Sequence, residues 1–256
     1  MTITESALAT AVTRLRAAGC VFAEDEAAVL RSVAGDDDAL ADLVSRRAQG
    51  EPLEQVAGYA DFCGLHVRLR KGVFVPRVRS ELLVRVAVAE QPDVLVDLCC
   101  GSGALGIAVK SQKPDVDLYA ADIDPVAVEC ARDNGVLHAY QGDLYSPLPA
   151  ALRHRVDVIL ANVPYVATAH IPLLPSEARD HEPRAALDGG GDGLDVFRRV
   201  AEDAASWLAP DGVLLSEITE AQEQPARQAL AERGLDGDVI YDDDLEARVI
   251  RARKRE

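Results

Sequence analysis

The chain has 256 residues, of which 48% are hydrophobic and 27% are charged. This composition is typical of a globular protein with material for one large domain, or one domain with a small appendage. Acidic residues outnumber basic ones by 43 to 27, and the formal net charge of -16 argues against bulk nucleic-acid binding. Five basic residues nevertheless cluster in one stretch: Arg68, Arg70, Lys71, Arg77 and Arg79.

Targeting signals and metal-binding patterns are absent from the sequence. No run of about twenty apolar residues could span a membrane, and the first residues, MTITESALAT, do not resemble a signal peptide. The five cysteines contain no C-x-x-C pair, which argues against a disulfide framework or a zinc site, and the five histidines show no metal spacing. We therefore expect a reduced, cytoplasmic protein without a metal and without a membrane partner.

The first fifty residues show three helical patterns. The third is the clearest, because acidic residues at 36–38 can cap its start, Arg46 and Arg47 suit its last turn, and Gly50 can end it. A connector follows, and its alternation around residues 66–69 predicts a short hairpin before Pro76. These features indicate a small helical N-terminal domain.

From about residue 80, helical and strand patterns alternate. Helices are expected at 81–90, 104–110, 125–134 and 194–208, and strands at 94–98, 117–122, 156–162 and 212–218, with ARVIRAR near the C-terminus closing the sheet. This alternation predicts an α/β fold with a mostly parallel, doubly wound sheet, which binds ligands beyond the carboxyl ends of its strands. We expect a helical domain with the hairpin connector at 1–74 and the sheet domain at 75–256.

A glycine-containing loop follows the first strand of the expected sheet. Gly101 and Gly103 let the backbone approach a ligand and open a helix whose N-terminus favours a carboxylate or phosphate. Asp122 ends the next strand, where an acid can accept hydrogen bonds from ribose hydroxyls, and Asp143 could accept from an adenine amino group. The pattern indicates a nucleotide-like cofactor.

The spacing within this loop distinguishes a dinucleotide from S-adenosylmethionine as the expected cofactor. A dinucleotide fingerprint places its first glycine about one residue after the strand, whereas here Asp97 precedes Gly101 by four positions. The D-x-x-x-G-x-G arrangement resembles the first motif of class I S-adenosylmethionine-dependent methyltransferases. That resemblance implies S-adenosyl-L-methionine as cofactor, held by Asp97, Cys99, Gly101, Gly103, Asp122, Ile123, Asp143, Leu144 and Asn162. Cys99 and Cys100 are interpreted as small loop fillers rather than nucleophiles.

A second motif follows the strand expected at 156–162. Asn162-Val163-Pro164-Tyr165 resembles the N-P-P-Y motif of methyltransferases that act on planar nitrogens. An amide oxygen and a backbone carbonyl can accept the two hydrogens of such a nitrogen, and Tyr165 offers an aromatic wall. The predicted catalytic effect is chiefly orientation, with acceptors that bind more strongly as charge develops on the nitrogen.

Two longer segments make the resemblance specific. EARDHEPRAALDGGGDGLDVFRRV, at 177–200, and GEPLEQVAGYADFCGLHVRLRKGVFVPRVRSELLV, at 50–84, are similar to segments of the HemK/PrmC family. The resemblance implies a protein-(glutamine-N5) methyltransferase whose substrate is a protein such as a peptide-chain release factor. It implies catalytic roles for Asn162, Pro164 and Tyr165, and substrate binding by these residues together with Val163, Arg77 and Glu182.

Two departures from the family pattern keep other functions open. Val163 replaces the first proline of N-P-P-Y, and Arg79 replaces an acid of P-R-P-E-T-E. The alternatives are a paralogue acting on another planar amide or amine, a DNA adenine methyltransferase, and a catalytically silent cofactor-binding protein. Glu182 has a competing interpretation as the partner of Arg184 in a local ion pair, while Phe197 and Trp207 are expected in the core.

Overall fold

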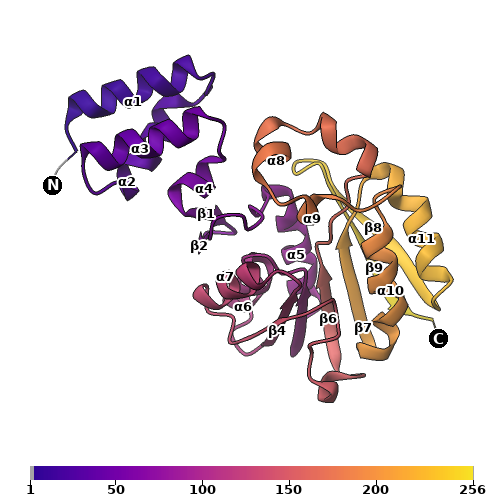
Figure 1. The fold of residues 1–256 in the computed structure, drawn as a ribbon. Helices are drawn as coiled ribbons and strands as arrows, with labels where there is room; N and C mark the ends of the chain where they lie inside the picture. The colour runs from indigo at the N-terminus through magenta and orange to yellow at the C-terminus, as the bar shows by residue number, and fades with distance from the viewer. Residues whose placement is uncertain (1–2, 256) are drawn as a thin grey trace.

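The computed structural model describes residues 3–255 and begins with a group of helices that stands apart from the sheet (Figure 1). They are α1 (Glu5–Ala17), α2 (Ala23–Val33), α3 (Asp37–Ala48) and the short α4 (Leu53–Ala57). Leu15, Leu30 and Leu40 form the centre of their own small core. The backbone N–H of Ala39 donates to Asp36 Oδ1 at 2.9 Å, so the predicted cap of the third helix is confirmed.

The hairpin predicted before Pro76 is present and lies against the larger domain. Its strands are β1 (Tyr59–Phe62) and β2 (Leu65–Arg68), paired antiparallel. Phe62 and Val67 are buried in the same apolar cluster as Leu83, which belongs to the helix that follows the connector. The hairpin therefore packs with the sheet domain, although it follows the helical domain directly in sequence.

The large domain contains a seven-stranded sheet with the order β5-β4-β3-β6-β7-β9-β8. Its strands are β3 (Val94–Leu98), β4 (Asp117–Asp122), β5 (His138–Gln141), β6 (Val156–Ala161), β7 (Leu208–Glu217), β8 (Leu235–Asp242) and β9 (Ala247–Lys254). The pairs from β5 to β7 are parallel, and β9 runs antiparallel to both β7 and β8. The predicted mostly parallel α/β sheet is confirmed.

The position predicted for ARVIRAR is wrong in one respect. This segment forms β9, which lies between β7 and β8, so β8 and not β9 is the edge of the sheet. Neither edge strand, β5 or β8, is predicted from the sequence. Edge strands bury little of their surface, and β8 carries Asp236, Gly237 and Asp238, so the apolar pattern that marks a buried strand is missing there.

Helices cover both faces of the sheet. Helices α5 (Glu81–Ala89), α6 (Ala104–Gln112) and α7 (Pro125–Asp133) contribute to one apolar cluster, and α10 (Asp195–Trp207) and α11 (Glu223–Ala231) to the other. Phe197 and Trp207 are buried in the second cluster, as predicted. No helix within residues 3–255 is long and apolar enough to cross a membrane.

Short helices fill the connections. Between β6 and α10 the chain forms α8 (Ser176–His181) and α9 (Arg184–Leu187). Short 3-10 helices occupy Val78–Ser80, Ala150–Leu152, Thr168–Leu173 and Glu220–Gln222. Helices α8 and α9 lie beyond the carboxyl ends of the central strands, where they face the connector that leads to α5 (Figure 1). This arrangement leaves a cavity at the edge of the sheet where the predicted motifs lie.

Candidate functional site

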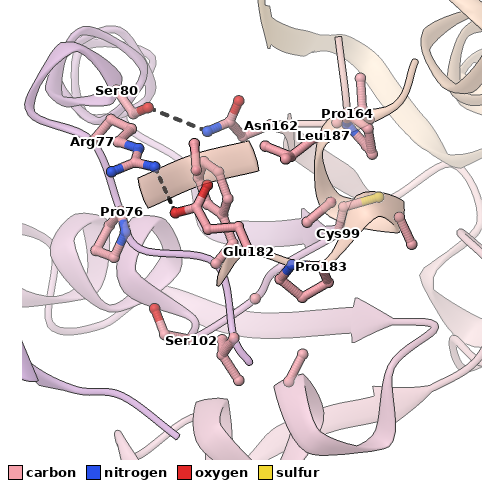
Figure 2. A pocket seen from close by; sticks show the side chains of 18 of the residues that line it. Pro76, Arg77, Ser80, Cys99, Ser102, Asn162, Pro164, Glu182, Pro183 and Leu187 are labelled. Atoms are coloured by element: carbon pink, nitrogen blue, oxygen red, sulfur yellow. Dashed lines mark hydrogen bonds and ion pairs between the residues drawn. The ribbon is translucent and has the colours of Figure 1, made fainter. Parts of the chain in front are cut away.

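A cavity of about 590 Å³ opens at the carboxyl ends of β3, β4 and β6. Its wall is formed by the loops that follow these strands, by α8 and α9, and by the connector before α5 (Figure 2). The predicted residues that line it are Arg77, Cys99, Gly101, Asp122, Ile123, Asn162, Val163, Pro164, Tyr165 and Glu182. Segments from residue 72 to residue 187 thus meet around one space.

Asp122 holds the glycine loop in place. Its carboxylate accepts the N–H of Gly101 at 2.9 Å on one oxygen and the N–H of Asp124 at 2.9 Å on the other. Gly101 has a φ of 53° and a Cβ at this position would meet no atom within 4 Å, so the glycine leaves free space at the cavity wall. Burial raises the pKa of Asp122, against the lowering effect of the backbone hydrogen bonds.

Asp97 lies outside the cavity lining and holds the first turn of α6, which follows the glycine loop. Its side chain is buried, Oδ2 accepts the N–H of Gly106 at 3.0 Å, and Oδ1 has no hydrogen-bond partner among the described residues. Burial raises the pKa of Asp97 to about 8, the Gly106 hydrogen bond opposes that shift, and the charge of Asp122 adds to it. Gly103 lies behind the wall as well, and a Cβ there would come within 2.9 Å of the Val136 side chain.

Asp143 and Leu144 lie outside the lining of this cavity. They line a second cavity, of about 540 Å³, together with Arg199 and Trp207. The Asp143 carboxylate forms an ion pair with the Arg199 guanidinium. The adenine contact expected of Asp143 therefore stays a prediction. For this contact, the Asp143 carboxylate would have to bind the adenine amino group and Arg199 together, or its ion pair with Arg199 would have to break.

The Asn162–Tyr165 loop is tied to neighbouring elements by its side chains. Asn162 Nδ2 donates to Ser80 Oγ at 3.2 Å (Figure 2). The Tyr165 hydroxyl donates to Glu217 Oε1 at 2.8 Å, and the Arg79 guanidinium lies over the Tyr165 ring at 5.6 Å. Burial raises the pKa of the Tyr165 hydroxyl and the charge of Glu217 raises it further, so the phenol remains a proton donor at neutral pH.

The backbone of the same loop is supported from the other side. Gln222 Nε2 donates to the Tyr165 carbonyl at 2.8 Å and to the Asp192 carbonyl at 3.1 Å. Gly193 has a φ of 80°, and a Cβ there would overlap the Tyr165 carbonyl oxygen, so the glycine permits this close approach. Sequence reasoning missed Gln222 because a lone glutamine after a strand carries no recognisable signal. Ser80 was also missed, although it lies inside the P-R-V-R-S-E motif.

Arg77 and Glu182, predicted substrate contacts, are brought together across 105 residues. Arg77 donates to Glu182 Oε1 at 2.5 Å, while Glu182 Oε2 has no partner within the described part of the chain (Figure 2). Burial raises the pKa of Glu182, and the charge of Arg77 opposes that shift. The alternative ion pair between Glu182 and Arg184 is wrong, because Arg184 pairs with Asp188 at 3.0 Å, one helical turn away.

Comparison with known proteins identifies the family. The family described as "Methyltransferase small domain" matches residues 65–199 of the chain. The chain is 34% identical over 246 residues to a release factor glutamine methyltransferase of Bradyrhizobium diazoefficiens, covering 85% of this chain and 83% of that protein. The chain belongs to the HemK/PrmC family. A second member, from Geobacter sulfurreducens, is 37% identical over 183 residues, which cover 69% of this chain and 63% of that protein.

A solved structure supports the fold assignment. The ribosomal protein L11 methylase of Lactobacillus delbrueckii subsp. bulgaricus superposes with a TM-score of 0.53, at 18% sequence identity, over 74% of this chain and 86% of that one. At this identity the likeness concerns the fold alone. The HemK/PrmC chain described here therefore has the class I S-adenosylmethionine-dependent methyltransferase fold, as predicted.

Both departures from the HemK/PrmC pattern have a local structural explanation. Val163 is buried in the apolar cluster that includes Leu98 and Ala161, so its side chain packs where the family motif has a proline. Arg79, where the family motif has an acid, places Nε 2.8 Å from the buried carboxylate of Glu217. The altered charge is thus balanced inside the protein.

In the glycine loop after β3, the Cys100 thiol is buried and the Cys99 thiol is partly buried. Burial raises the pKa of both Cys99 and Cys100, and the nearby carboxylates of Asp97 and Asp122 raise it further. A thiol that stays protonated is a poor nucleophile. This environment agrees with their interpretation as loop fillers. All five cysteines of the chain are free.

Proposed function

We propose that this chain transfers a methyl group from S-adenosyl-L-methionine to the side-chain amide nitrogen of a glutamine in a protein, with a peptide-chain release factor as the first candidate. One observation carries the proposal: the Asn162 loop and the Asp122–Gly101 loop line the same cavity. A planar nitrogen held at the first loop would face a cofactor held at the second. The relatives named above are release factor glutamine methyltransferases by name.

The residues around the cavity fit this cofactor. Gly101 leaves free space at the wall, and Asp122 is an acid fixed by two backbone N–H groups, which suits recognition of ribose hydroxyls. Ile123 is 63% exposed and gives an apolar surface beside Asp122. We assign cofactor binding to these three residues, with Asp97 and Gly103 supporting the loop. The bound cofactor would supply an electrophilic methyl group on a sulfonium.

The protein contributes to the reaction by orientation. The Asn162 side-chain oxygen and the Val163 carbonyl are the proposed acceptors for the two hydrogens of the substrate amide, and the Tyr165 ring is the proposed wall against its plane. When the site holds the nitrogen in line with the methyl group, the two reactants lose their freedom of motion on binding rather than in the chemical step, and the activation free energy of that step is lower. No strong base is needed before attack, since both acceptors strengthen as positive charge develops on the nitrogen.

The charged surroundings favour a protein acceptor over a nucleic acid. Three arginines of the basic cluster are paired with carboxylates: Arg70 with Glu129 and Asp133, Arg77 with Glu182, and Arg79 with Glu217. A nucleic-acid groove requires basic groups that release counterions from phosphates. We propose that the helical domain selects the protein partner. We place the domain boundary near Gly58 rather than at residue 74, because the hairpin packs with the sheet domain.

The proposal is tested by methyl transfer from labelled cofactor. The purified chain is incubated with a release factor, with a variant of that factor whose acceptor glutamine is replaced by alanine, with a small primary amide and with a DNA duplex. We expect label in the intact release factor alone, and fragment mass spectra that place one methyl group on the glutamine side chain. Label in the small amide or the duplex, or in the alanine variant at the same level, would overturn the assignment.

A further inference from the structure

A buried carboxylate connects the residues of the Asn162 loop. Glu217, at the end of β7, accepts the Ser80 hydroxyl at 2.7 Å on Oε2 and the Tyr165 hydroxyl at 2.8 Å on Oε1. Ser80 in turn lies 3.2 Å from Asn162 Nδ2. Glu217 and Ser80 are only 4% and 2% exposed, so solvent cannot replace these contacts. The path from Glu217 to Asn162 runs through a single hydroxyl group.

The charge of Glu217 is balanced within the same group of residues. Arg79 Nε lies 2.8 Å from Glu217 Oε1, and the Arg79 guanidinium also donates to the Tyr165 hydroxyl. A buried carboxylate is tolerated when it is paired and fully hydrogen-bonded. Both oxygens of Glu217 thus have donors, Arg79 and Tyr165 at Oε1 and Ser80 at Oε2. The departure from the family motif at Arg79 supplies this pairing.

The direction of these hydrogen bonds fixes the Asn162 amide. A serine hydroxyl has one hydrogen to donate, and an ionised carboxylate can only accept. Since Ser80 donates its hydrogen to Glu217, its oxygen can only accept from Asn162, and an amide accepts through oxygen but donates through nitrogen. Nδ2 must therefore face Ser80, which turns Oδ1 the other way, as Figure 2 shows.

We propose that Glu217 is a positioning residue for methyl transfer, acting through Ser80 on the Asn162 amide and directly on the Tyr165 hydroxyl. Its negative charge sets the polarity of the chain of hydrogen bonds, so that Asn162 presents an acceptor rather than a donor to the substrate nitrogen. The binding of the substrate nitrogen by Asn162 Oδ1 rests on the function proposed above. The orientation of the Asn162 amide by Ser80 and Glu217 does not depend on that function.

Glu217→Gln is the decisive variant, because it preserves shape and changes polarity. Arg79 and Tyr165 both donate toward Oε1, so the new side chain would place its oxygen there and its NH2 group toward Ser80. Ser80 would then accept from Gln and donate to Asn162, and the Asn162 amide would turn over. We expect the single-turnover rate to fall about 10- to 100-fold, the scale seen when outer partners that orient a site are changed.

Ser80 variants test the same path from its middle. Ser80→Ala removes the hydroxyl and is expected to slow transfer by a similar factor, whereas Ser80→Thr keeps a hydroxyl and is expected to restore most of the rate. Ser216→Ala is the matched control: Ser216 is fully buried beside Glu217, but its hydroxyl donates to the Ala161 carbonyl at 2.7 Å and does not contact Asn162 Nδ2. Binding of S-adenosylhomocysteine, measured by calorimetry, should be unchanged in all four variants.

A readout that needs no substrate separates this inference from the proposed function. The side-chain NH2 resonances of Asn162 in ¹⁵N NMR spectra should shift in Glu217→Gln and Ser80→Ala and keep their wild-type positions in Ser80→Thr and Ser216→Ala. If the wild type methylates no glutamine, the proposed function fails, and these resonances still decide how the amide is held. Unchanged Asn162 resonances in Glu217→Gln, or an equal rate loss in Ser216→Ala, would overturn the inference.

Discussion

At the scale of single residues, Asn162 and Asp122 are held by separate sets of hydrogen bonds. Its neutral amide lies at the end of β6 and is bound on its nitrogen side by Ser80, so its oxygen is directed by contacts that do not involve the cofactor loop. Asp122 is held separately, by the N–H groups of Gly101 and Asp124. Binding of the cofactor and orientation of the acceptor should therefore respond to different substitutions.

Asn162→Ala tests this separation. We expect the single-turnover rate of methyl transfer to fall about 10²–10³-fold, the scale for loss of one preorganised hydrogen-bond partner. The affinity for S-adenosylhomocysteine should change little, since Asn162 holds none of the contacts that fix the Asp122 loop. Asp122→Ala should do the reverse and weaken that affinity by about 1–3 kcal/mol. Near-normal transfer by Asn162→Ala would mean that the N-P-P-Y mechanism does not apply to this chain.

Asp97 predicts a pH dependence of stability. Its pKa is raised by burial from 3.8 to about 8, so the folded state binds a proton more tightly than the unfolded state between these values. Stability from this group is then full below pH 3.8 and is lost as pH rises toward 8. The magnitude is on the order of a few kcal/mol.

Asp97→Asn removes this titration and nearly preserves the shape. The free energy of unfolding of the variant, relative to wild type at the same pH, should increase from pH 5 to pH 8 in urea titrations. The new amide also adds an unsatisfied buried donor, which lowers stability by about 1–3 kcal/mol at every pH. The slope of the difference with pH, and not its absolute size, is therefore the test. A difference independent of pH would show that Asp97 is ionised in the folded protein.

At the scale of elements, the glycine-rich segment before α10 shapes the Asn162 loop. Gly189 and Gly193 approach the carbonyl oxygens of Pro164 and Tyr165 so closely that a Cβ at either position would overlap them. Gly191, between them, has open space around its Cβ position and no positive φ. Gly189 and Gly193 are therefore required for the close approach to the Asn162 loop, whereas Gly191, with the same chemistry, is not.

Gly193→Ala and Gly191→Ala form a matched pair. Gly193→Ala should lower stability, since a left-handed backbone costs a non-glycine residue about 1–3 kcal/mol, and it should slow transfer because the displaced Tyr165 carbonyl shifts the loop. Gly191→Ala should leave the transfer rate and the melting temperature close to wild type. Equal rates in the two variants would show that the approach to Tyr165 does not control the loop.

At the scale of the whole molecule, an ion pair links the helical domain to the sheet domain. Arg47 of α3 pairs with Glu26 at 2.7 Å within the helical domain and with Glu177 of α8 at 2.7 Å. Helix α8 lines the cavity, so this ion pair connects the helical domain to the wall of the site. Helices α1 to α4 of the helical domain contribute no residue to the lining of the cavity.

A truncated chain starting at Tyr59 tests whether the helical domain selects the protein acceptor while the sheet domain binds the cofactor. It keeps the hairpin and every residue that lines the cavity, so it should bind S-adenosylhomocysteine as the full chain does and lose most of its rate on a protein acceptor. A chain starting at Val75 is the comparison: it lacks Phe62 and Val67 of the main core and should unfold at a lower temperature. Full-rate methylation of the protein acceptor by the chain starting at Tyr59 would exclude substrate selection by the helices.

The sequence alone predicted the central strands of the sheet, the glycine loop after β3 and the position of the Asn162 motif after β6. These features are local: an apolar strand followed by a glycine turn, or by Asn162, is readable within about ten residues, and the fold places such strand ends together. The edge strands β5 and β8 were not readable because strands that bury little surface carry no apolar pattern.

Only the tertiary structure decided which side chains hold the site together. Arg77 meets Glu182 across 105 residues, Ser80 meets Glu217 across 137, and the Glu182–Arg184 pair suggested by proximity in sequence does not form. From the sequence, Arg79 is a basic residue in place of an acid of the family motif, and only the structure shows that it pairs with the buried carboxylate of Glu217. Hydrogen bonds and ion pairs depend on distances of a few ångströms between elements, which one sequence does not encode in any local pattern.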